Sequence, residues 1–409
     1  MKTLILSYIF ASIFSISSAQ QLINLSTLKG GGVSNNLDVQ PPFGIYVSAY
    51  SDSQSPLSSI FVKYTNGSIS LSDLYKRQVG SLGEISPYPI TDSAYVATSL
   101  SDDQLKILNG VIYLATTSQL NNKYFHVFDI SHTQTIDYGS IGNINATVLF
   151  LNTNMKTVPA RSTTISQWKQ SADAVASLYP GFPTDLIDSK NYQIFSNPIQ
   201  SGKFNFFFTT VEKFSLSLVA FYLKTYRGVK FSTQSQYYNV DKSTTSDYTT
   251  TGFYMKPLGV KGSTVIINTL QNANYQGLVG ANILGNLPNR EKVTVGVYDD
   301  ANSFQESDPV TSYPSPWSTP NIGKTFQISS SDGDDGVYYV QYFVHQGSLN
   351  TGSTSHAGTQ KTANPIATSP GPWNPGSTHS SNVQTSTKSQ GKVQMLIPFI
   401  ISIIMLFYC

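Results

Sequence analysis

Acidic residues gather in one short segment of the chain, residues 331–336 (SDGDDG), directly before an apolar run. Carboxylate oxygens are the ligands that calcium prefers, and the glycines permit a tight turn that could bring three carboxylates together. The segment lacks the ligand spacing of an EF-hand and the glutamate that closes its coordination shell. We therefore predict a solvated hairpin turn, with a calcium site at Asp332, Asp334 and Asp335 as the alternative. No other cofactor is predicted.

The five histidines do not form a recognisable catalytic set. His356 and His379 lie in a polar segment rich in Ser, Thr and Gly, whereas His126, His132 and His345 lie in or beside apolar, strand-like runs. A nucleophile, its base and the group that orients the base must converge in space. The chain also lacks the G-x-S-x-G turn that would display a catalytic serine. We therefore predict a structural role for each histidine.

Carboxylate pairs leave one enzymatic alternative open. Two acidic side chains that face each other at ~5–10 Å can hydrolyse a glycosidic bond, and the chain has 23 acidic residues. The two partners usually come from distant parts of a chain, so no local pattern selects a pair. We assign no catalytic residue and predict a non-enzymatic protein, with an extracellular, glycosidase-like hydrolase as the alternative.

Aromatic residues between positions 225 and 255 are a candidate binding surface. They stand among Ser, Thr and Gln and comprise Tyr226, Tyr237, Tyr238, Tyr248, Phe253 and Tyr254. Tyrosine offers a large contact area at a small entropic cost and stacks well on sugars or on partner surfaces. Ordinary sheet packing is the alternative. We select Tyr237 and Tyr238 as ligand-binding candidates, and predict a glycan or a microbial or host surface protein as the partner.

Three N-x-[ST] sequons predict N-linked glycosylation, at Asn24, Asn66 and Asn145. The alternative is that an asparagine lies on a buried strand. This alternative applies most to Asn145, because an apolar run follows it directly at residues 148–151.

Both ends of the chain resemble processing signals. Residues 1–19 combine Lys2, an apolar segment and a small-residue cleavage site, which predicts a secretory signal peptide. Residues 392–409 hold an apolar run of 15 residues, shorter than the ~20 of a spanning helix. A polar spacer and the small residues Ser380, Ser381 and Asn382 precede it, which predicts a GPI-attachment signal at one of the three. We expect a protein on the extracellular face of the plasma membrane, attached to the outer leaflet by lipid, with secretion as the alternative.

Composition agrees with an extracellular location. Charged residues make up 12% of the chain, against a usual ~25%. The net charge of +2 is too small to indicate a nucleic-acid partner. The single cysteine is Cys409, in the predicted C-terminal signal, so neither a disulfide nor a cysteine zinc site is predicted.

The elements that would position these residues are mainly strands. Short aromatic and β-branched runs alternate with Gly, Pro, Asn and Ser, and Asn66-Gly67 is a strong hairpin signal. Gly30, Gly31 and Gly32 lack the Lys-Ser/Thr of a phosphate loop and predict a flexible entry into a strand. The expected strands are residues 43–47, 59–64, 94–97, 111–115, 125–128, 204–208, 216–223, 264–267, 293–298 and 337–344.

One segment has helical periodicity, with apolar residues at Ile165, Trp168, Val175 and Tyr179. We therefore predict a helix over 162–179 within a connector, residues 136–189. The fold class is then all-β in the main, with two tandem β-sandwich modules, residues 20–135 and 190–346, joined by the helical connector. Residues 347–391 are almost free of aliphatic side chains, so we expect a disordered, O-glycosylated stalk.

Three segments in this order resemble the CUB-like domains of nematode secreted proteins. They are a Gly-Ile-Tyr-Val strand at 44–47, a Ser-x-Ile-x-Val strand at 58–62, and Ser-Pro-Tyr-Pro-x-x-x-Ser-Ala-Tyr-Val at 86–96. The resemblance covers residues 22–130, with residues 190–346 as a diverged partner. It implies β-sandwich modules of CUB-like or jelly-roll type, and in some members a GPI-type tail. It also implies a protective role in innate immunity at an epithelial surface, without a defined chemistry.

Overall fold

A computed structural model of the chain describes residues 20–77, 79–139, 141–153, 161–184, 193–201, 204–237, 242–245, 249–269, 278–286, 292–298, 303–309, 325–330 and 336–345. The chain divides into two compact units, residues 1–367 and 368–409, and all the described residues belong to the first. The predicted signal peptide, stalk and C-terminal signal lie outside the described residues.

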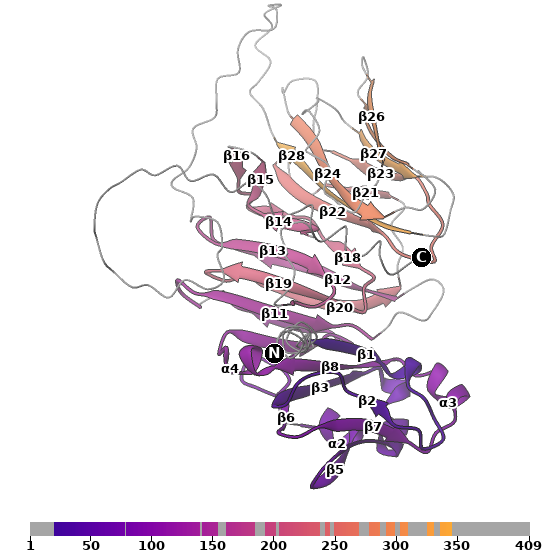
Figure 1. The fold of residues 1–409 in the computed structure, drawn as a ribbon. Helices are drawn as coiled ribbons and strands as arrows, with labels where there is room; N and C mark the ends of the chain where they lie inside the picture. Colours follow the sequence, from indigo (N-terminus) through magenta and orange to yellow (C-terminus); the bar gives the residue numbers. More distant parts are fainter. Residues whose placement is uncertain are drawn as a thin grey trace, which may run out of the picture. The chain divides into compact units, whose positions relative to one another are not determined.

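Two four-stranded antiparallel sheets form the N-terminal sheet pair (Figure 1). Their strand orders are β1-β8-β3-β6 and β2-β7-β4-β5. The predicted Asn66-Gly67 hairpin is confirmed, because Tyr64 pairs with Gly67 across the turn. The strands are β1 (Gln21–Asn24), β2 (Asn35–Asn36), β3 (Phe43–Ala49), β4 (Ile60–Tyr64), β5 (Gly67–Ser70), β6 (Tyr88–Ile90), β7 (Ala94–Thr98) and β8 (Gly110–Thr116).

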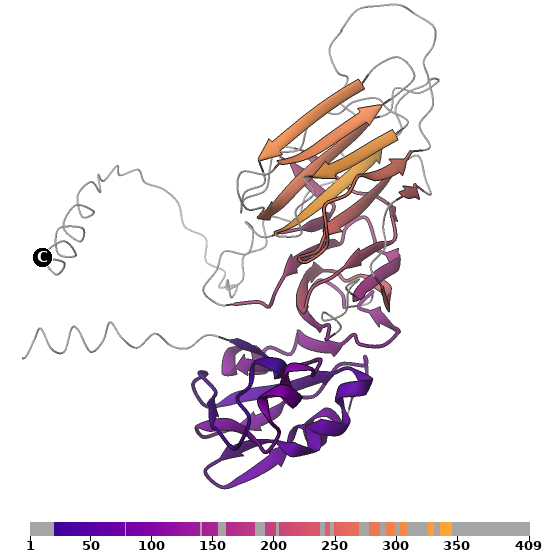
Figure 2. The same ribbon diagram turned by 90° about the vertical axis from the view of Figure 1, so that its right-hand side faces the viewer.

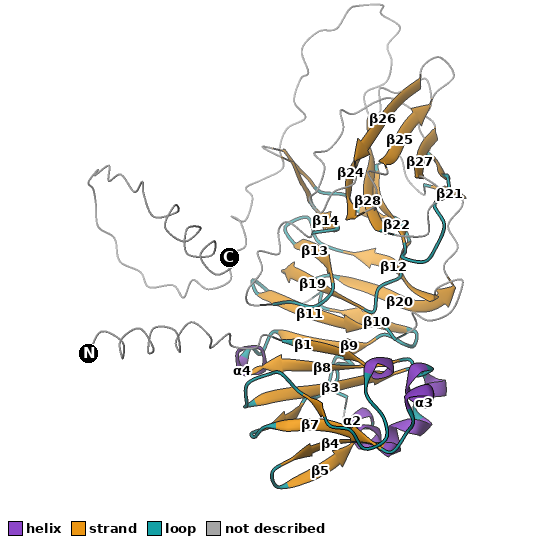
Figure 3. Cartoon of the chain, turned by 45° about the vertical axis from the view of Figure 1, so that its right-hand side comes forward, coloured by secondary structure: helices purple, strands orange, loops and turns teal. Residues whose placement is uncertain are grey.

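Short helices accompany the N-terminal sheet pair (Figure 3). Each α-helix begins after a Ser or Thr whose hydroxyl accepts a backbone N–H of the first turn, and at Ser101 the side chain of Gln104 completes a capping box. The helical segments are η1 (Leu25–Thr27), η2 (Ser51–Ser53), η3 (Ser55–Ser59), α2 (Leu71–Tyr75), α3 (Asp102–Lys106) and α4 (Thr117–Asn121).

The middle sheet pair has the orders β14-β13-β19-β11-β9 and β10-β20-β12-β18. Its neighbours are antiparallel except for β9 and β11, which are parallel. The strands are β9 (Phe125–Asp129), β10 (Gln134–Asp137), β11 (Asn145–Leu151), β12 (Arg161–Lys169), β13 (Val175–Pro180), β14 (Phe195–Asn197), β18 (Phe214–Leu216), β19 (Ala220–Tyr226) and β20 (Lys230–Tyr237).

The C-terminal sheet pair, whose later strands are orange in Figure 2, has the orders β17-β22-β28-β24 and β21-β23-β27-β25-β26. β15 and β16 form a separate hairpin. The strands are β15 (Ile199–Ser201), β16 (Phe204–Phe206), β17 (Thr210–Val211), β21 (Lys242–Thr244), β22 (Thr250–Lys256), β23 (Val265–Asn268), β24 (Leu278–Asn286), β25 (Lys292–Tyr298), β26 (Ser303–Pro309), β27 (Thr325–Ser330) and β28 (Val337–His345).

Several sheets are buried on both faces. In β8, Ile112 and Leu114 enter the core of the N-terminal sheet pair, whereas Val111 and Tyr113 enter a second core shared with Leu149 and its neighbours in the middle sheet pair. The same alternation occurs in β22, where Phe253 and Tyr254 belong to different cores. Successive side chains of a strand point to opposite faces. When each face meets a core, consecutive residues are all apolar, and the strand is a continuous apolar run. The successive cores join the sheets into a stack of layers.

The mainly β fold class is confirmed, whereas the two tandem β-sandwich modules are not. The described strands form seven sheets, and the segment predicted to be a connector contributes strands to two of them.

The predicted helix over 162–179 is wrong, because this segment forms β12 and β13 with a turn between them. Its helical spacing has a local cause. Gln167 has φ 55° at an irregularity in the pairing of β12 with β20, between Ser166 and Lys169. A bulge adds one residue to the strand, so Ile165 and Trp168 reach the same core although they are three residues apart.

Candidate functional site

The three sequon asparagines are all exposed. Asn24 is the last residue of β1, Asn66 lies in the turn of the β4–β5 hairpin, and Asn145 is the first residue of β11. The concern that Asn145 lies on a buried strand does not apply, since burial begins one residue later, at Ala146. Each asparagine is therefore accessible to a glycan, and the glycosylation of all three stays a prediction.

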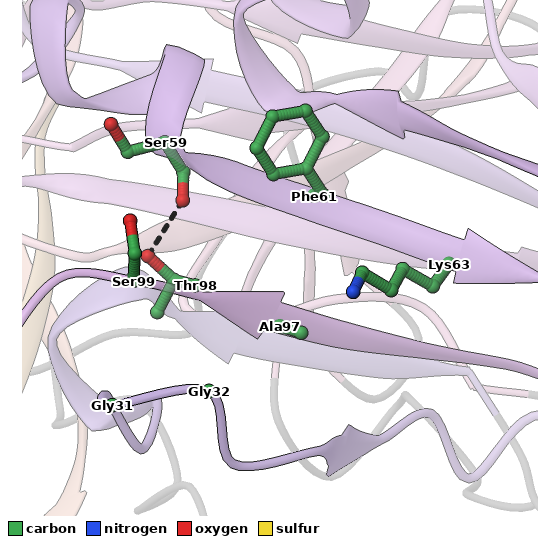
Figure 4. A pocket seen from close by; sticks show the side chains of 8 residues that line it. All are labelled: Gly31, Gly32, Ser59, Phe61, Lys63, Ala97, Thr98 and Ser99. Carbon is green, nitrogen blue, oxygen red and sulfur yellow. Dashed lines mark hydrogen bonds between the residues drawn. The ribbon is translucent and has the colours of Figure 1, made fainter.

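A shallow depression of about 540 Å³ lies over strands β4 and β7 of the N-terminal sheet pair (Figure 4). In β4, Ile60 and Val62 are buried, so the alternate residues Phe61 and Lys63 face outward. Ala97 of β7 pairs with Phe61 and leaves space beside the ring. The lining residues are Gly31, Gly32, Ser59, Phe61, Lys63, Ala97, Thr98 and Ser99.

A glycine turn forms one edge of the depression. The backbone N–H of Gly31 donates to Leu100 O at 2.9 Å, and that of Gly32 donates to Thr98 O at 2.8 Å. Both glycines have positive φ, 65° and 83°, which a residue with a Cβ adopts only with strain. The expected flexible entry into a strand is thus a bonded turn beside β7. Neither position puts a side chain over the depression (Figure 4).

The depression offers chemistry for binding. Phe61 is half-buried and gives a ring face on which an apolar face can stack, and the exposed Lys63 supplies an ammonium group on the same strand. The hydroxyl of Thr98 donates to Ser59 O at 2.8 Å, which fixes β7 against the start of β4. The lining contains no carboxylate, imidazole or thiol. It can therefore hold a polar ligand but supplies no ordinary general acid–base pair.

His126 lies in β9, and its imidazole packs edge-on against Tyr138 with ring centroids 5.4 Å apart. Its Nδ1 is 3.8 Å from Oε1 of Glu84. Burial lowers the pKa of His126, and the nearby carboxylate only partly opposes this effect. Burial thus disfavours the charged form of the His126 imidazole. The other strand histidine, His345, ends β28 as predicted.

Asp129 is the buried carboxylate of β9, 9% exposed. Burial raises its pKa, and a hydrogen bond from the Ser131 backbone N–H at 2.9 Å partly opposes the rise. In the part of the chain that the structure describes, no group of three His, Cys, Asp or Glu could hold a metal ion. The proposed calcium ligands Asp332, Asp334 and Asp335 lie outside that part.

The aromatic cluster expected between 225 and 255 does not form one exposed surface. Phe253 and Tyr254 are 6% and 3% exposed and belong to the cores on either side of β22. Tyr237 ends β20 opposite Arg161, and Tyr238 lies outside the described residues. Ligand binding by Tyr237 and Tyr238 stays a prediction, as does lipid attachment at Ser380, Ser381 or Asn382, which are also outside the described residues.

Sequence reasoning missed the depression because its residues lie in three short segments far apart in the chain. One signal was available: the alternation in β4 places Lys63 and Phe61 opposite the buried Ile60 and Val62. Among the described residues, no helix is both long enough and apolar enough to cross a membrane.

The chain matches the model of a protein family described as "Transmembrane glycoprotein" over residues 40–404. The predicted resemblance to nematode CUB-like domains is therefore wrong. It rested on short alternating strand patterns, which many β proteins share. No curated protein matches the chain.

Three solved structures show weak similarity. The insecticidal delta-endotoxin Cry8Ea1 of Bacillus thuringiensis is 10% identical, with a TM-score of 0.17 over 46% of this chain and 42% of that chain. The VP2 subviral particle of infectious bursal disease virus is 10% identical, with a TM-score of 0.15 over 79% of each chain. The lipid-containing bacteriophage PM2 structure is 8% identical, with a TM-score of 0.15 over 81% of this chain and 88% of that chain. At such TM-scores none of them informs the function of this chain.

Proposed function

The chain belongs to the transmembrane glycoprotein family, and we propose that it acts on the outer cell surface as a binding protein rather than an enzyme. Three exposed sequon asparagines and the signal-like residues 1–19 support display on that surface. Small residues, a polar spacer and an apolar tail support attachment by a glycolipid near Ser380, Ser381 and Asn382.

The proposed ligand is a glycan with an acidic sugar, and the depression over β4 and β7 is its binding surface. The single observation that carries this proposal is the pair Phe61 and Lys63, which stand two residues apart on one outward face. A sugar ring stacks on an aromatic face through its C–H groups, while an ammonium group attracts a carboxylate or sulfate. Among the lining residues Lys63 is titratable and no carboxylate is present, whereas the hydrolysis of a glycosidic bond usually uses two carboxylates, and this supports binding rather than hydrolysis.

The ligand proposal is tested with two matched sugars, 3′-sialyllactose and lactose, on the purified glycoprotein. Lys63→Gln should weaken binding of the sialylated sugar by up to about fivefold, since an exposed ion pair contributes ~0.2–1 kcal/mol. It should leave lactose binding unchanged. Lys261→Gln, at an exposed lysine beyond β22, is the control. Equal effects of the two substitutions, or equal affinity of the wild type for the two sugars, would contradict the proposal.

The lipid anchor is tested on intact cells. A phospholipase specific for phosphatidylinositol should release the protein into the medium if a glycolipid holds it. Protein that stays on the cell after this treatment, while a known lipid-anchored protein is released, would point to a polypeptide tail in the membrane.

A further inference from the structure

The chain contains two Asn-Gly dipeptides, Asn66-Gly67 and Asn109-Gly110. Such a dipeptide can react without an enzyme, because the backbone nitrogen of the glycine can attack the side-chain Cγ of the asparagine. Glycine favours this step, since it has no Cβ to hinder the approach and its backbone adopts many conformations. The surroundings of each dipeptide decide whether the two groups can meet, and these surroundings differ.

Asn66-Gly67 lies at the tip of the β4–β5 hairpin (Figure 3). Both residues are exposed, as are Thr65 and Ser68 on either side of them. Gly67 pairs with Tyr64, and this is the last pair of the ladder that joins β4 to β5. The end of a ladder opens at a lower cost in free energy than its interior does. The Asn66 side chain can therefore reach the backbone nitrogen of Gly67 when the tip opens.

Asn109-Gly110 lies between α3 and β8, where it is held by its neighbours. The backbone N–H of Asn109 donates to Ser53 Oγ at 2.9 Å, and Tyr50 N–H donates to Asn109 O at 3.0 Å. Gly110 is buried, and a Cβ at this position would lie 2.5 Å from Leu25 Cδ1. The backbone of this dipeptide can thus rotate only after the packed structure around it has opened, which costs more free energy.

We propose that Asn66 is a site of spontaneous deamidation in every chain that carries no glycan there, and that a glycan on Asn66 protects the hairpin from this reaction. The protective role rests on the proposed glycoprotein function, whereas the reaction itself needs only the unmodified Asn66-Gly67 dipeptide. Asn109 stays intact in both forms of the chain.

The reaction needs water as its only co-reactant. Gly67 N loses its proton and forms a bond to Asn66 Cγ, while the bond from Cγ to Nδ2 breaks, so ammonia leaves and a five-membered succinimide remains. Water then adds to one of the two ring carbonyls, and the bond from that carbonyl carbon to the ring nitrogen breaks. Opening at Cγ gives aspartate. Opening at the main-chain carbonyl carbon gives isoaspartate, in which the backbone runs through the side chain.

A glycan on Asn66 blocks the first step, because Nδ2 then carries the anomeric carbon and the bulk of the sugar hinders the attack on Cγ. Without the glycan, both products place a new carboxylate in the hairpin that carries Lys63, a residue of the depression. Lys63 pairs with Ser68, the third residue of the sequon, so the charge changes beside the proposed binding surface.

The test compares the full glycosylated chain with its Ser68→Ala variant, which loses the sequon but keeps Asn66-Gly67. Both folded proteins are incubated at mildly alkaline pH, and peptide mapping by mass spectrometry follows aspartate and isoaspartate at Asn66 and Asn109. The variant should convert Asn66 at least about tenfold faster than Asn109, because the packed dipeptide opens at a higher cost in free energy. The glycosylated wild type should convert neither.

A second variant shows whether the glycine itself is needed. Gly67→Ala in the Ser68→Ala background adds a methyl group that hinders the approach of Asn66 Cγ to the backbone nitrogen. The hairpin can accept this methyl group, since the nearest atom that it would meet is Oη of Tyr64 at 3.3 Å. Conversion of Asn66 should then be severalfold slower than in Ser68→Ala alone.

Equal conversion of Asn66 and Asn109 in Ser68→Ala, or equal rates with and without Gly67→Ala, would overturn the inference. Conversion of glycosylated Asn66 at the rate seen in the variant would overturn the protective role. A wild type that carries no sugar at Asn66 and converts there would support the reaction, but it would refute the glycosylation of this residue and with it the protective role.

Discussion

Gln341 of β28 gives the sharpest stability prediction. Its side chain is 2% exposed and reaches Ser196 in β14, the edge strand of its sheet. Gln341 Nε2 donates to Ser196 O at 2.7 Å and to Thr251 Oγ1 at 3.1 Å, and Ser196 N–H donates to Gln341 Oε1 at 2.9 Å. The amide therefore pairs both backbone groups of Ser196, as a neighbouring strand would.

The substitution Gln341→Leu removes all three hydrogen bonds, so that the backbone N–H and C=O of Ser196 stay buried but lose their partner. At ~1 kcal/mol for each bond the loss is about 3 kcal/mol, and the unpaired groups of Ser196 add to it. A change of this size corresponds to a fall of ~6–12 °C in Tm for a cooperative unit of 150–250 residues.

Differential scanning calorimetry of the purified protein measures this fall. Gln200→Leu is the matched control, because Gln200 is exposed in β15 and a surface change usually stays within ~0.5 kcal/mol. A Tm for Gln341→Leu within ~2 °C of that of Gln200→Leu would refute the reasoning, since it would mean that the three bonds contribute almost nothing.

Two further predictions concern the backbone and pH. Gly228→Ala should be strongly destabilising, because the φ of 84° is strained for alanine and the new methyl group would overlap the carbonyl of Tyr138. The control Gly259→Ala, with φ 75° and open space around the new methyl group, should lower the unfolding free energy by only ~1 kcal/mol, and equal losses for the two variants in urea denaturation would contradict the packing at Gly228. Because burial lowers the pKa of His126 in the folded state, the unfolded state binds the proton more tightly, and the free energy of unfolding should fall as pH drops below ~6.5. His126→Gln should make this fall shallower, and a pH profile of Tm that the substitution leaves unchanged would argue against the burial of His126.

The strands could be predicted from the sequence because their residues are distinctive. Aromatic and β-branched runs at Phe43–Ala49, Gly110–Thr116 and Val337–His345 are all strands. Their partners could not be predicted. A strand that is buried on both faces shows no alternation, so the sequence of β8 or β22 does not reveal that its side chains enter two different cores.

The failed helix and the unforeseen cavities have different causes. Gln167 in the left-handed region shifts the alternation of β12, and only the backbone reveals this shift. A cavity of about 210 Å³ brings together Asn24, Asn152 and Val219, which are separated by long stretches of chain. The sequon marks Asn24 in the sequence, but nothing there relates it to the other two residues. Only the packing of β8 on β11 and β19 brings the three together.

The central claim is that this chain is an outward-facing glycoprotein. The most direct measurement labels intact cells with a membrane-impermeant reagent, isolates the labelled protein and maps its glycopeptides by mass spectrometry. The account predicts labelled protein with sugar on Asn24, Asn66 and Asn145. Protein that stays unlabelled on intact cells, or labelled protein with all three asparagines unmodified, would contradict it.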